Sequence, residues 1–487
     1  MTNVQIPYKV SFHMHLMLIF PPHKGCVKSL FLQTEGEGIG HKPPLGLLSI
    51  AAYLKKNSTH TVSILDLSAR PLSREALHEA LASFKPDVVG ITAWTDFWFP
   101  ACEVMRSVKD FAPDTHIVIG GPHVGIFPKE TLEQPLVNSI VLGDGEASTL
   151  SLLNHLQFKT HLCPGVYFKA YPLPGSYEFH IEKDLDSLTF PDRSLLLLSD
   201  YTSVLSRSDS IATMITSRGC PHQCVYCKLN FQKVMFRSAK NVVAEFSHIA
   251  DLGIKEIEIY DDTFTMYKER LISICNLLIE KNIPVKWAIR DRVGSITKET
   301  LALMKRAGCS RIHLGIESGN ERILANIKKK ITLSQAENAV ALAKKAGLVV
   351  LAYYMIGLPG ESYDDVMQTI QFALKLDSRY AEFNICIPYP GTEMYRVGLE
   401  KGIIPHDFWL EFAKNPVENF IVPYLYEENI SKQEMIELRN IATKKYYARL
   451  KVFIREAFDC RSVAEFIRKA KMGIPMLKNA ILNQCDL

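Results

Sequence analysis

Three cysteines stand close together in the middle of the chain, at Cys220, Cys224 and Cys227. Their C-x3-C-x2-C spacing lets one short loop bring three thiolates to the same side of a bound group. Cysteine thiolates are the usual ligands of iron–sulfur clusters, and a [4Fe–4S] cube takes four ligands. The three cysteines therefore predict such a cluster with one iron left open. An open iron can chelate a small molecule and pass it an electron.

A structural zinc site and a chance grouping are the alternatives. Structural zinc sites usually show two separated pairs of ligands, and His222, inside the loop, is wrongly spaced for such a pair. The chain has 11 cysteines, so some grouping arises by chance. This group, however, follows a predicted strand and carries the aromatic Tyr226 directly before its third cysteine. We therefore favour the cluster.

The composition is that of an ordinary globular protein. With 487 residues the chain is too long for one core, so we expect two or three domains. The net charge of +4 is small for this length and gives no case for a nucleic-acid partner. The cysteines are otherwise scattered, unlike a secreted disulfide framework. We find no signal peptide and no apolar run of the ~18–20 residues that span a bilayer, and we expect a cytoplasmic protein.

Two series of alternating strands and helices position these residues. The first predicts a doubly wound parallel, Rossmann-like sheet. Its predicted strands are Leu16–Phe20, Thr61–Leu65, Val88–Thr92, His116–Ile119 and Ser139–Leu142, and its predicted helices are Leu45–Lys55, Arg74–Ser83 and Ala101–Phe111. The second has six strands and predicts a partial (β/α)6 barrel with active groups at the carboxyl ends of its strands. These strands are Ile211–Thr216, Glu256–Tyr260, Val285–Ile289, Arg311–Leu314, Val349–Met355 and Ala381–Ile387.

This pattern predicts four regions. They are an N-terminal domain over residues 10–150, a linker over 151–200, a barrel core over 201–400 and a helical region over 401–487. The last contains two basic amphipathic helices, Lys432–Lys451 and Val463–Leu477. These helices could contact an anionic membrane surface, but we favour packing against the barrel.

The cysteine loop resembles the C-x3-C-x-(aromatic)-C signature of the radical S-adenosylmethionine (SAM) superfamily. The resemblance implies a [4Fe–4S] cluster on the three cysteines and SAM at its open iron. It also implies SAM contacts from Tyr226, from Asp261 and Asp262, and from Glu317 and Ser318 within Gly315–Gly319. The aspartates replace the usual Gly-Gly-Glu segment. Alternatively, Glu317 is a structural cap, and the aspartates cap the next helix.

The strand ends of the first domain resemble the cobalamin-binding domain of the B12-dependent radical SAM family. That family carries P-P-L-G-L, G-G-x-H and G-x-G-E segments, and all three occur here. The resemblance implies cobalamin contacts from Leu45, Gly46, Thr92, Gly120, Gly121, Gly143 and Glu146. The D-x-H-x-x-G motif that supplies a cobalt ligand is absent, and His123 is expected to pack near the corrin instead of binding cobalt. The alternative is a domain that has kept the fold and lost cobalamin.

The resemblance implies an enzyme that cleaves SAM to a 5′-deoxyadenosyl radical and methylates an unactivated carbon of a small-molecule substrate. It also implies an electron donor such as flavodoxin or ferredoxin. Three alternatives remain open. They are a cyclisation, rearrangement or oxidation with both cofactors, a radical SAM enzyme without B12, and a non-catalytic iron–sulfur redox protein.

Overall fold

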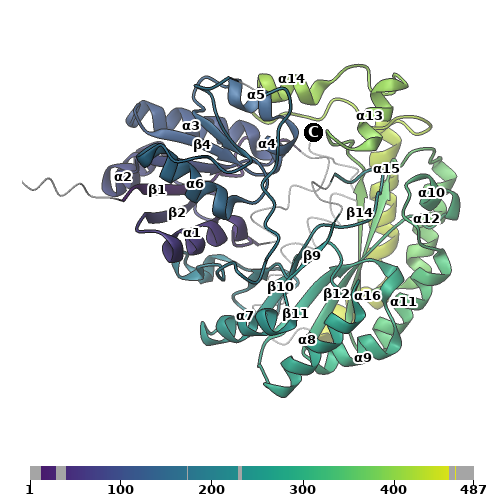
Figure 1. Ribbon diagram of the computed structural model, residues 1–487. Coiled ribbons are helices and arrows are strands. Elements are labelled where there is room, and N and C mark those ends of the chain that lie inside the picture. The colour runs from purple at the N-terminus through teal and green to yellow at the C-terminus, as the bar shows by residue number, and fades with distance from the viewer. Residues whose placement is uncertain (1–12, 29–39, 173, 229–232, 460–466, 468–487) are drawn as a thin grey trace, which may run out of the picture. The chain divides into compact units, whose positions relative to one another are not determined.

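The computed structural model describes residues 13–28, 40–172, 174–228, 233–459 and 467. The chain divides into two compact units, each with its own sheet (Figure 1). The first is formed by residues up to 22 together with 44–182 and 188–196. The second is formed by residues 23–43, 183–187 and those from 197 onward.

The first unit is built on a six-stranded sheet in the order β2-β1-β3-β4-β5-β6. The strands are β1 (His15–Phe20), β2 (Thr61–Asp66), β3 (Val88–Thr92), β4 (His116–Gly120), β5 (Ser139–Val141) and β6 (Val166–Phe168). The first five are parallel, and β6 runs antiparallel to β5. Because the chain order reverses between β1 and β3, the carboxyl ends of these strands form the usual ligand-binding edge of such a sheet.

Helices bury both faces of this sheet, as the apolar strands require. Helix α1 (Leu45–Asn57) packs against α6 (Gly145–Phe158), and α2 (Arg74–Phe84) packs against α3 (Trp98–Phe111). Two short helices, α4 (Pro122–Ile126) and α5 (Pro128–Glu133), follow β4. The doubly wound prediction is confirmed.

The predicted linker over residues 151–200 differs from the structure. Residue 150 falls inside α6, and β6 completes the sheet. The chain then returns to the same sheet, where Gly143 forms a bridge with His180. Much of this segment is therefore part of the first unit. Its mixed, proline-containing sequence hid one short edge strand, which has no periodicity to reveal it.

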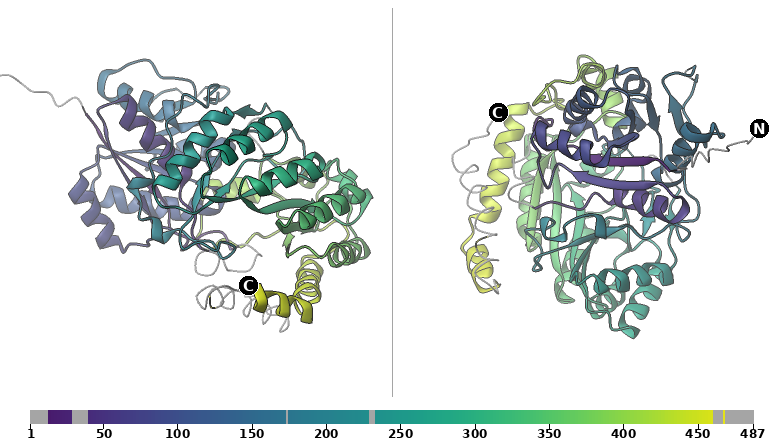
Figure 2. Two further views of the ribbon diagram at one scale, coloured as in Figure 1. Left: turned by 90° about the horizontal axis from the view of Figure 1, so that it is seen from below. Right: turned by 90° about the vertical axis from the view of Figure 1, so that its left-hand side faces the viewer.

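The second unit contains a parallel sheet in the order β14-β13-β12-β11-β10-β7. Its strands are β7 (Ala212–Met214), β10 (Glu256–Ile259), β11 (Lys286–Asp291), β12 (Cys309–Glu317), β13 (Val349–Ile356) and β14 (Tyr380–Ile385). The connecting helices are α7 (Ala239–Asp251), α8 (Lys268–Glu280), α9 (Lys298–Arg306), α10 (Glu321–Asn326), α11 (Leu333–Lys345) and α12 (Tyr363–Leu376). They cover one face of the sheet (Figures 1 and 2), which confirms the partial (β/α)6 barrel.

Alternation along the strands gives this sheet two different faces. In β12, Ile312, Leu314 and Ile316 are fully buried under the helices. The residues between them point to the other, inner face, because successive side chains of a strand point in opposite directions. In β12 and β10 the inner residues include Arg311, His313, Glu256 and Glu258, so the inner face of the barrel is polar.

The C-terminal region consists of α13 (Glu393–Glu400), α14 (Phe408–Lys414), α15 (Lys432–Tyr447) and α16 (Leu450–Asp459). Helix α15 packs on β13, β14 and α12. The hydroxyls of Tyr446 and Tyr447 donate to the carbonyls of Ser378 and Ala381. This packing agrees with the expected docking on the barrel. The predicted helix Val463–Leu477 lies outside the described residues, apart from residue 467.

Across the described part of the chain, every helix is too short or too polar to span a bilayer.

The bridge at Gly143 predicts a large effect of one methyl group on stability. A Cβ there would lie 2.0 Å from the His180 carbonyl oxygen, and the backbone φ is +88°. We expect Gly143→Ala to destabilise the first unit by about 1–3 kcal/mol. Gly46→Ala is the control, because its Cβ would meet nothing within 4 Å. Thermal unfolding checks this, and equal midpoints for the two variants would contradict it.

Candidate active site

The cysteine loop begins where β7 ends, and a buried carboxylate fixes that point. Asp261, just after β10, accepts hydrogen bonds from the backbone N–H groups of Thr216 and Ser217, with N···O distances of 2.5 and 3.1 Å. Both of their hydroxyls also donate to it, that of Ser217 at 2.7 Å. Asp261 is 1% exposed. Its oxygens are thus engaged by the loop itself, which gives it a positioning role different from the predicted SAM contact.

Two arginines brace the same turn from outside. Arg270 of α8 donates to the carbonyl and hydroxyl oxygens of Thr216 at 2.8 and 2.7 Å. Arg237 donates to the carbonyl of Ile215 at 2.9 Å and forms a buried ion pair with Glu245. Strand β8 (Ser217–Arg218), at the start of the loop, pairs antiparallel with β9 (Met235–Phe236), directly before Arg237. The loop therefore starts from a rigid, fully bonded base.

Asp262 lies near the thiols, and the backbone N–H of Gly219 donates to its carboxylate. It is exposed, and its charge raises the pKa of both the Cys220 and the Cys227 thiols. Helix α8 begins at Lys268 with Tyr267 as its N-cap and no side-chain capping bond. The alternative that the two aspartates cap the next helix is therefore wrong.

The three thiols lie close enough to influence one another. Burial raises the pKa of the Cys220 thiol, and the charges of Asp262 and Cys224 raise it further. Loss of water around its sulfur, followed by the charges of Cys224, Asp262 and Cys220, raises the pKa of Cys227 to about 11. Three thiolates in this loop would repel each other without a cation. Iron ligation removes that penalty, so the donor set fits the cluster.

Within the described residues, no group of three Cys, His, Asp or Glu side chains is placed tightly enough to hold a single metal ion.

A chain of contacts links Cys224 to residues on three other parts of the barrel. Arg292, directly after β11, donates to the Cys224 sulfur at 3.3 Å and to the carbonyl oxygen of Lys329. The Lys329 Nζ lies 2.7 Å from Glu317 Oε1 and 3.3 Å from the Tyr226 hydroxyl. The predicted residues Tyr226 and Glu317 are thus brought together beside Cys224. Sequence reasoning missed Arg292 and Lys329, since neither belongs to a motif.

Glu317 is held in a strained backbone conformation. Its φ is +72°, which a residue with a side chain rarely adopts. The ion pair with Lys329 fixes it, and the two side chains are only 10% and 5% exposed. A Cβ at position 315 would lie 2.5 Å from Glu317 Oε1, so Gly315 is needed for this carboxylate. Glu317 does not cap α10, whose N-cap is Asn320.

Ser318 faces α12 instead of the thiols. Its hydroxyl lies 3.2 Å from that of Thr369 and accepts the backbone N–H of Asn320 at 3.2 Å. The residue is fully buried. This packing role differs from the SAM contact that the resemblance implied.

The predicted cobalamin residues lie at the strand ends of the first unit, and they divide into two groups. Gly121 and Gly143 have positive φ, and a Cβ there would strike Ala93 and His180 respectively. The fold itself requires them. A Cβ at Gly46 would meet nothing within 4 Å, and one at Gly120 would make only an ordinary contact at 3.7 Å.

The other predicted residues occupy the same ends of the elements. Leu45 begins α1, Thr92 ends β3, and Glu146 is buried in the first turn of α6. Trp94, just after β3, is 52% exposed, although it is a large aromatic side chain. Gly120 pairs with Thr92, two residues before Trp94, so an open glycine near an exposed aromatic ring fits a large planar ligand at this edge.

His123 is part of the core of the first unit. Its ring stacks on Trp98 with centroids 4.2 Å apart, and Nδ1 lies 3.3 Å from the Thr95 hydroxyl. It has no exposed surface, and burial lowers its pKa to about 3, so the ring is neutral. These contacts agree with the expected packing role, since a cobalt ligand would have to leave this stack.

Comparisons with known proteins agree with this geometry. The sequence pattern of the Radical SAM superfamily matches residues 214–373, and that of the B12 binding domain matches residues 39–153. An uncharacterized methyltransferase of Pyrococcus horikoshii is 32% identical over 457 residues, which cover 92% of this chain and 95% of that protein. An anaerobic magnesium-protoporphyrin IX monomethyl ester cyclase of Rubrivivax gelatinosus is 26% identical, with 86% and 76% covered.

The fold is also found among solved structures. The cobalamin-dependent S-adenosylmethionine radical enzyme OxsB, solved with aqua-cobalamin and S-adenosylmethionine bound, superposes with a TM-score of 0.71. The similarity covers 97% of this chain and 72% of that one, at 15% sequence identity. At this identity the likeness concerns the fold alone.

The loop after β13 gives a pH-dependent prediction. Glu361 is 2% exposed, accepts the N–H groups of Gly357 and Leu358, and has its pKa raised by burial to about 8. Because the folded state holds this proton more tightly, its stabilising effect is lost as pH rises through about 8. Glutamine does not titrate, so the unfolding midpoint of wild type minus that of Glu361→Gln should be smaller at pH 9 than at pH 6. An identical difference at both pH values in thermal unfolding would contradict this assignment.

Proposed function

Because this chain belongs to the cobalamin-dependent radical SAM family, we propose that it methylates an unactivated carbon of a small-molecule substrate. The observation that carries the proposal is the chain of contacts from Cys224 through Arg292 and Lys329 to Glu317. It places a fixed carboxylate, a buried cation and a tyrosine beside the Cys224 thiol. A protein that only stored or passed electrons would not need a strained carboxylate at this position.

The chain's residues would divide the work at the cluster. When bound, the cluster would supply the electron that cleaves SAM to a 5′-deoxyadenosyl radical, and cobalamin would carry the methyl group. Cys220, Cys224 and Cys227 would hold the iron, and the Arg292 N–H would stabilise the Cys224 thiolate. The exposed Asp262 carboxylate is the candidate for the SAM amino group. Tyr226 and Glu317 would line the same side.

The first unit would hold the second cofactor. We assign Gly46 and Gly120 to the approach of the corrin and Trp94 to its apolar surface, with Leu45, Thr92 and Glu146 at the same edge. Gly121 and Gly143 would act indirectly, by giving the strand-end loops their shape. An external one-electron donor of the flavodoxin or ferredoxin type would reduce the protein.

Methylation is preferred over the alternatives on one ground. The relative from Pyrococcus horikoshii, named a methyltransferase, matches over nearly its whole length. The Rubrivivax cyclase, at lower identity, supports a second candidate in which both cofactors serve a ring-forming reaction. The fate of the SAM methyl group separates the two.

A labelling experiment tests the proposal. The anaerobically reconstituted holoenzyme is incubated with SAM deuterated at the methyl group, a chemical reductant and a small-molecule extract. We expect a new product with all three deuterons, because a methyl group that is transferred intact keeps its C–D bonds, and mass spectrometry detects it. Cys224→Ala should lose the product and the iron. Cys275→Ala should keep both, because Cys275 is buried in α8 away from the loop.

Two outcomes would contradict the proposal. Consumption of SAM with unlabelled products would favour the ring-forming or oxidative candidate. Iron retained at the wild-type level in Cys224→Ala would refute the assignment of the loop as the cluster site.

A further inference from the structure

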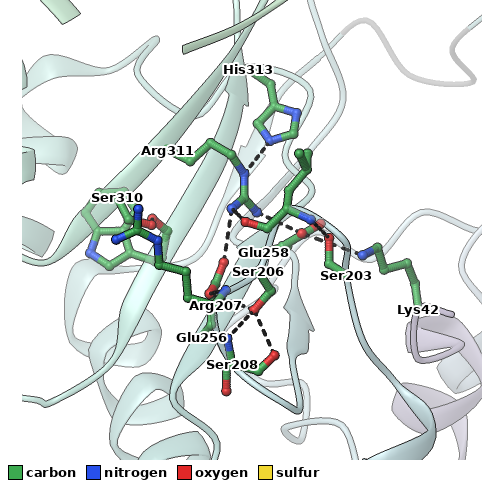
Figure 3. Close-up of polar contacts among 12 residues, drawn as sticks. Lys42, Ser203, Ser206, Arg207, Ser208, Glu256, Glu258, Ser310, Arg311 and His313 are labelled. Atoms are coloured by element: carbon green, nitrogen blue, oxygen red, sulfur yellow. Dashed lines mark hydrogen bonds and ion pairs between the residues drawn. The ribbon is translucent and has the colours of Figure 1, made fainter. Parts of the chain in front are cut away.

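The inner face of the barrel carries a buried ionic network (Figure 3). Arg311 of β12 pairs with Glu256 and Glu258 of β10, at 3.1 and 2.9 Å. Lys42 and Arg290 also approach Glu258, each at 3.6 Å. These ion pairs join three cations to two carboxylates.

At one end of this network, residues 205–207 hydrogen-bond the charged groups. The Glu256 carboxylate accepts the Ser206 hydroxyl at 2.7 Å and the Arg207 N–H at 3.2 Å. Arg311 donates to the Leu205 carbonyl at 2.7 Å. Figure 3 shows this segment beside the two strands. Glu256 and Arg311 are therefore used by the fold, and both are almost completely buried.

Arg290 is the second-last residue of β11, and its side chain is held differently. Its guanidinium lies over the Tyr260 ring, 3.8 Å from the centroid, and the Tyr260 hydroxyl donates to Glu258 Oε2 at 3.2 Å. The Arg290 side chain is 31% exposed, and its 3.6 Å approach to Glu258 is longer than a hydrogen bond. A guanidinium has five N–H donors. Arg290 also hydrogen-bonds the Tyr260 side chain, so the tyrosine fixes the guanidinium, whose five donors outnumber these contacts.

Tyr353 of β13 adds a second donor. Arg311 Nε donates to His313 Nε2 at 2.9 Å, and an arginine cannot accept. His313 is neutral, because burial and the nearby Arg290 and Arg311 lower its pKa well below its usual value. Its proton must then sit on Nδ1, which lies 2.8 Å from the Tyr353 hydroxyl and donates to it. The tyrosine's own proton is left to point elsewhere.

Both donors lie on the side of the network nearest the cysteine loop. Arg290 and Arg292 are two residues apart in extended chain, so they share a face with their Cα atoms about 7 Å apart. Arg292 contacts the Cys224 sulfur. Tyr353 pairs with Gly315, two residues before Glu317. Arg290 pairs with His313 across β11 and β12, and His313 Nδ1 lies 2.8 Å from the Tyr353 hydroxyl, so both donors lie beside His313. A further acid, Glu382, pairs with Tyr353 across β13 and β14, and the Asn384 amide donates to its Oε1 at 3.0 Å.

We propose that Arg290 and Tyr353 bind an anionic group of the substrate, a carboxylate or a phosphate, with Lys42 adding positive charge. This inference rests on the proposed function, because it places the substrate on the inner face beside the cluster. A planar guanidinium fixed on an aromatic ring offers two parallel N–H groups to such an anion. The fold would therefore select substrates that carry an acidic group.

The experiment measures anion binding by the reconstituted holoenzyme with saturating SAM. Inorganic phosphate and acetate are titrated separately, so that the two anion types are distinguished. The variants are Arg290→Gln, Arg290→Lys and Tyr353→Phe. Arg306→Gln, at the exposed end of α9, removes the same charge elsewhere and serves as the control. SAM binding is measured in parallel by equilibrium dialysis.

We expect at least one anion to bind wild type and Arg306→Gln equally, and Arg290→Gln to weaken that binding by roughly tenfold or more. Tyr353→Phe should weaken it by a few fold, and Arg290→Lys should restore part of it. SAM binding should be unchanged in all four variants. If the wild-type protein binds the anion but does not bind SAM, the result would count against the proposed function and not against the anion site.

Two results would overturn the inference. The first is anion binding that is absent, or equal in wild type and Arg290→Gln. The second is loss of SAM binding in Arg290→Gln together with competition between the anion and SAM, because Arg290 would then bind the carboxylate of SAM.

Discussion

The site depends on the position of one buried carboxylate. Asp261 receives four hydrogen bonds from Thr216 and Ser217, the two residues that lead β7 into the cysteine loop. An unpaired charge at 1% exposure would be costly, so these bonds are obligatory. The carboxylate therefore fixes the direction in which the loop leaves the sheet. Every later contact, from Cys224 to Glu317, requires that direction.

The structure separates residues that hold the site from residues that face it. Asp261, Arg270 and Ser318 bond to the chain, while Asp262, Arg290 and Tyr353 keep exposed or unused polar groups. The same division applies in the first unit, where Gly143 serves the fold and Gly46 leaves space. Adjacent members of one motif thus play opposite roles. Rigid support around a few free groups is what a preorganised active site needs.

The sequence predicted the two alternating series, because strand and helix periodicities are local properties. It also predicted that the three thiols lie close together in one loop, because their spacing in the sequence is local. It could not predict that Arg292 and Lys329 complete the site, since their contacts join segments far apart in the chain. It assigned Asp261 and Ser318 by their motif, and only the fold shows which way each side chain points. The strand β6 was missed because its three residues are too few to show a periodicity, and the return of the chain at His180 because that contact joins distant segments.

The central claim is that the three thiolates hold a four-iron cluster whose open iron binds SAM. The most direct test is electron paramagnetic resonance of the dithionite-reduced, reconstituted protein, recorded without SAM and then with SAM labelled with 15N at its amino group. The account predicts a [4Fe–4S]+ signal whose g values shift on adding SAM, with a hyperfine coupling to the 15N nucleus. A signal that does not change with SAM, or one without coupling to the label, would contradict it.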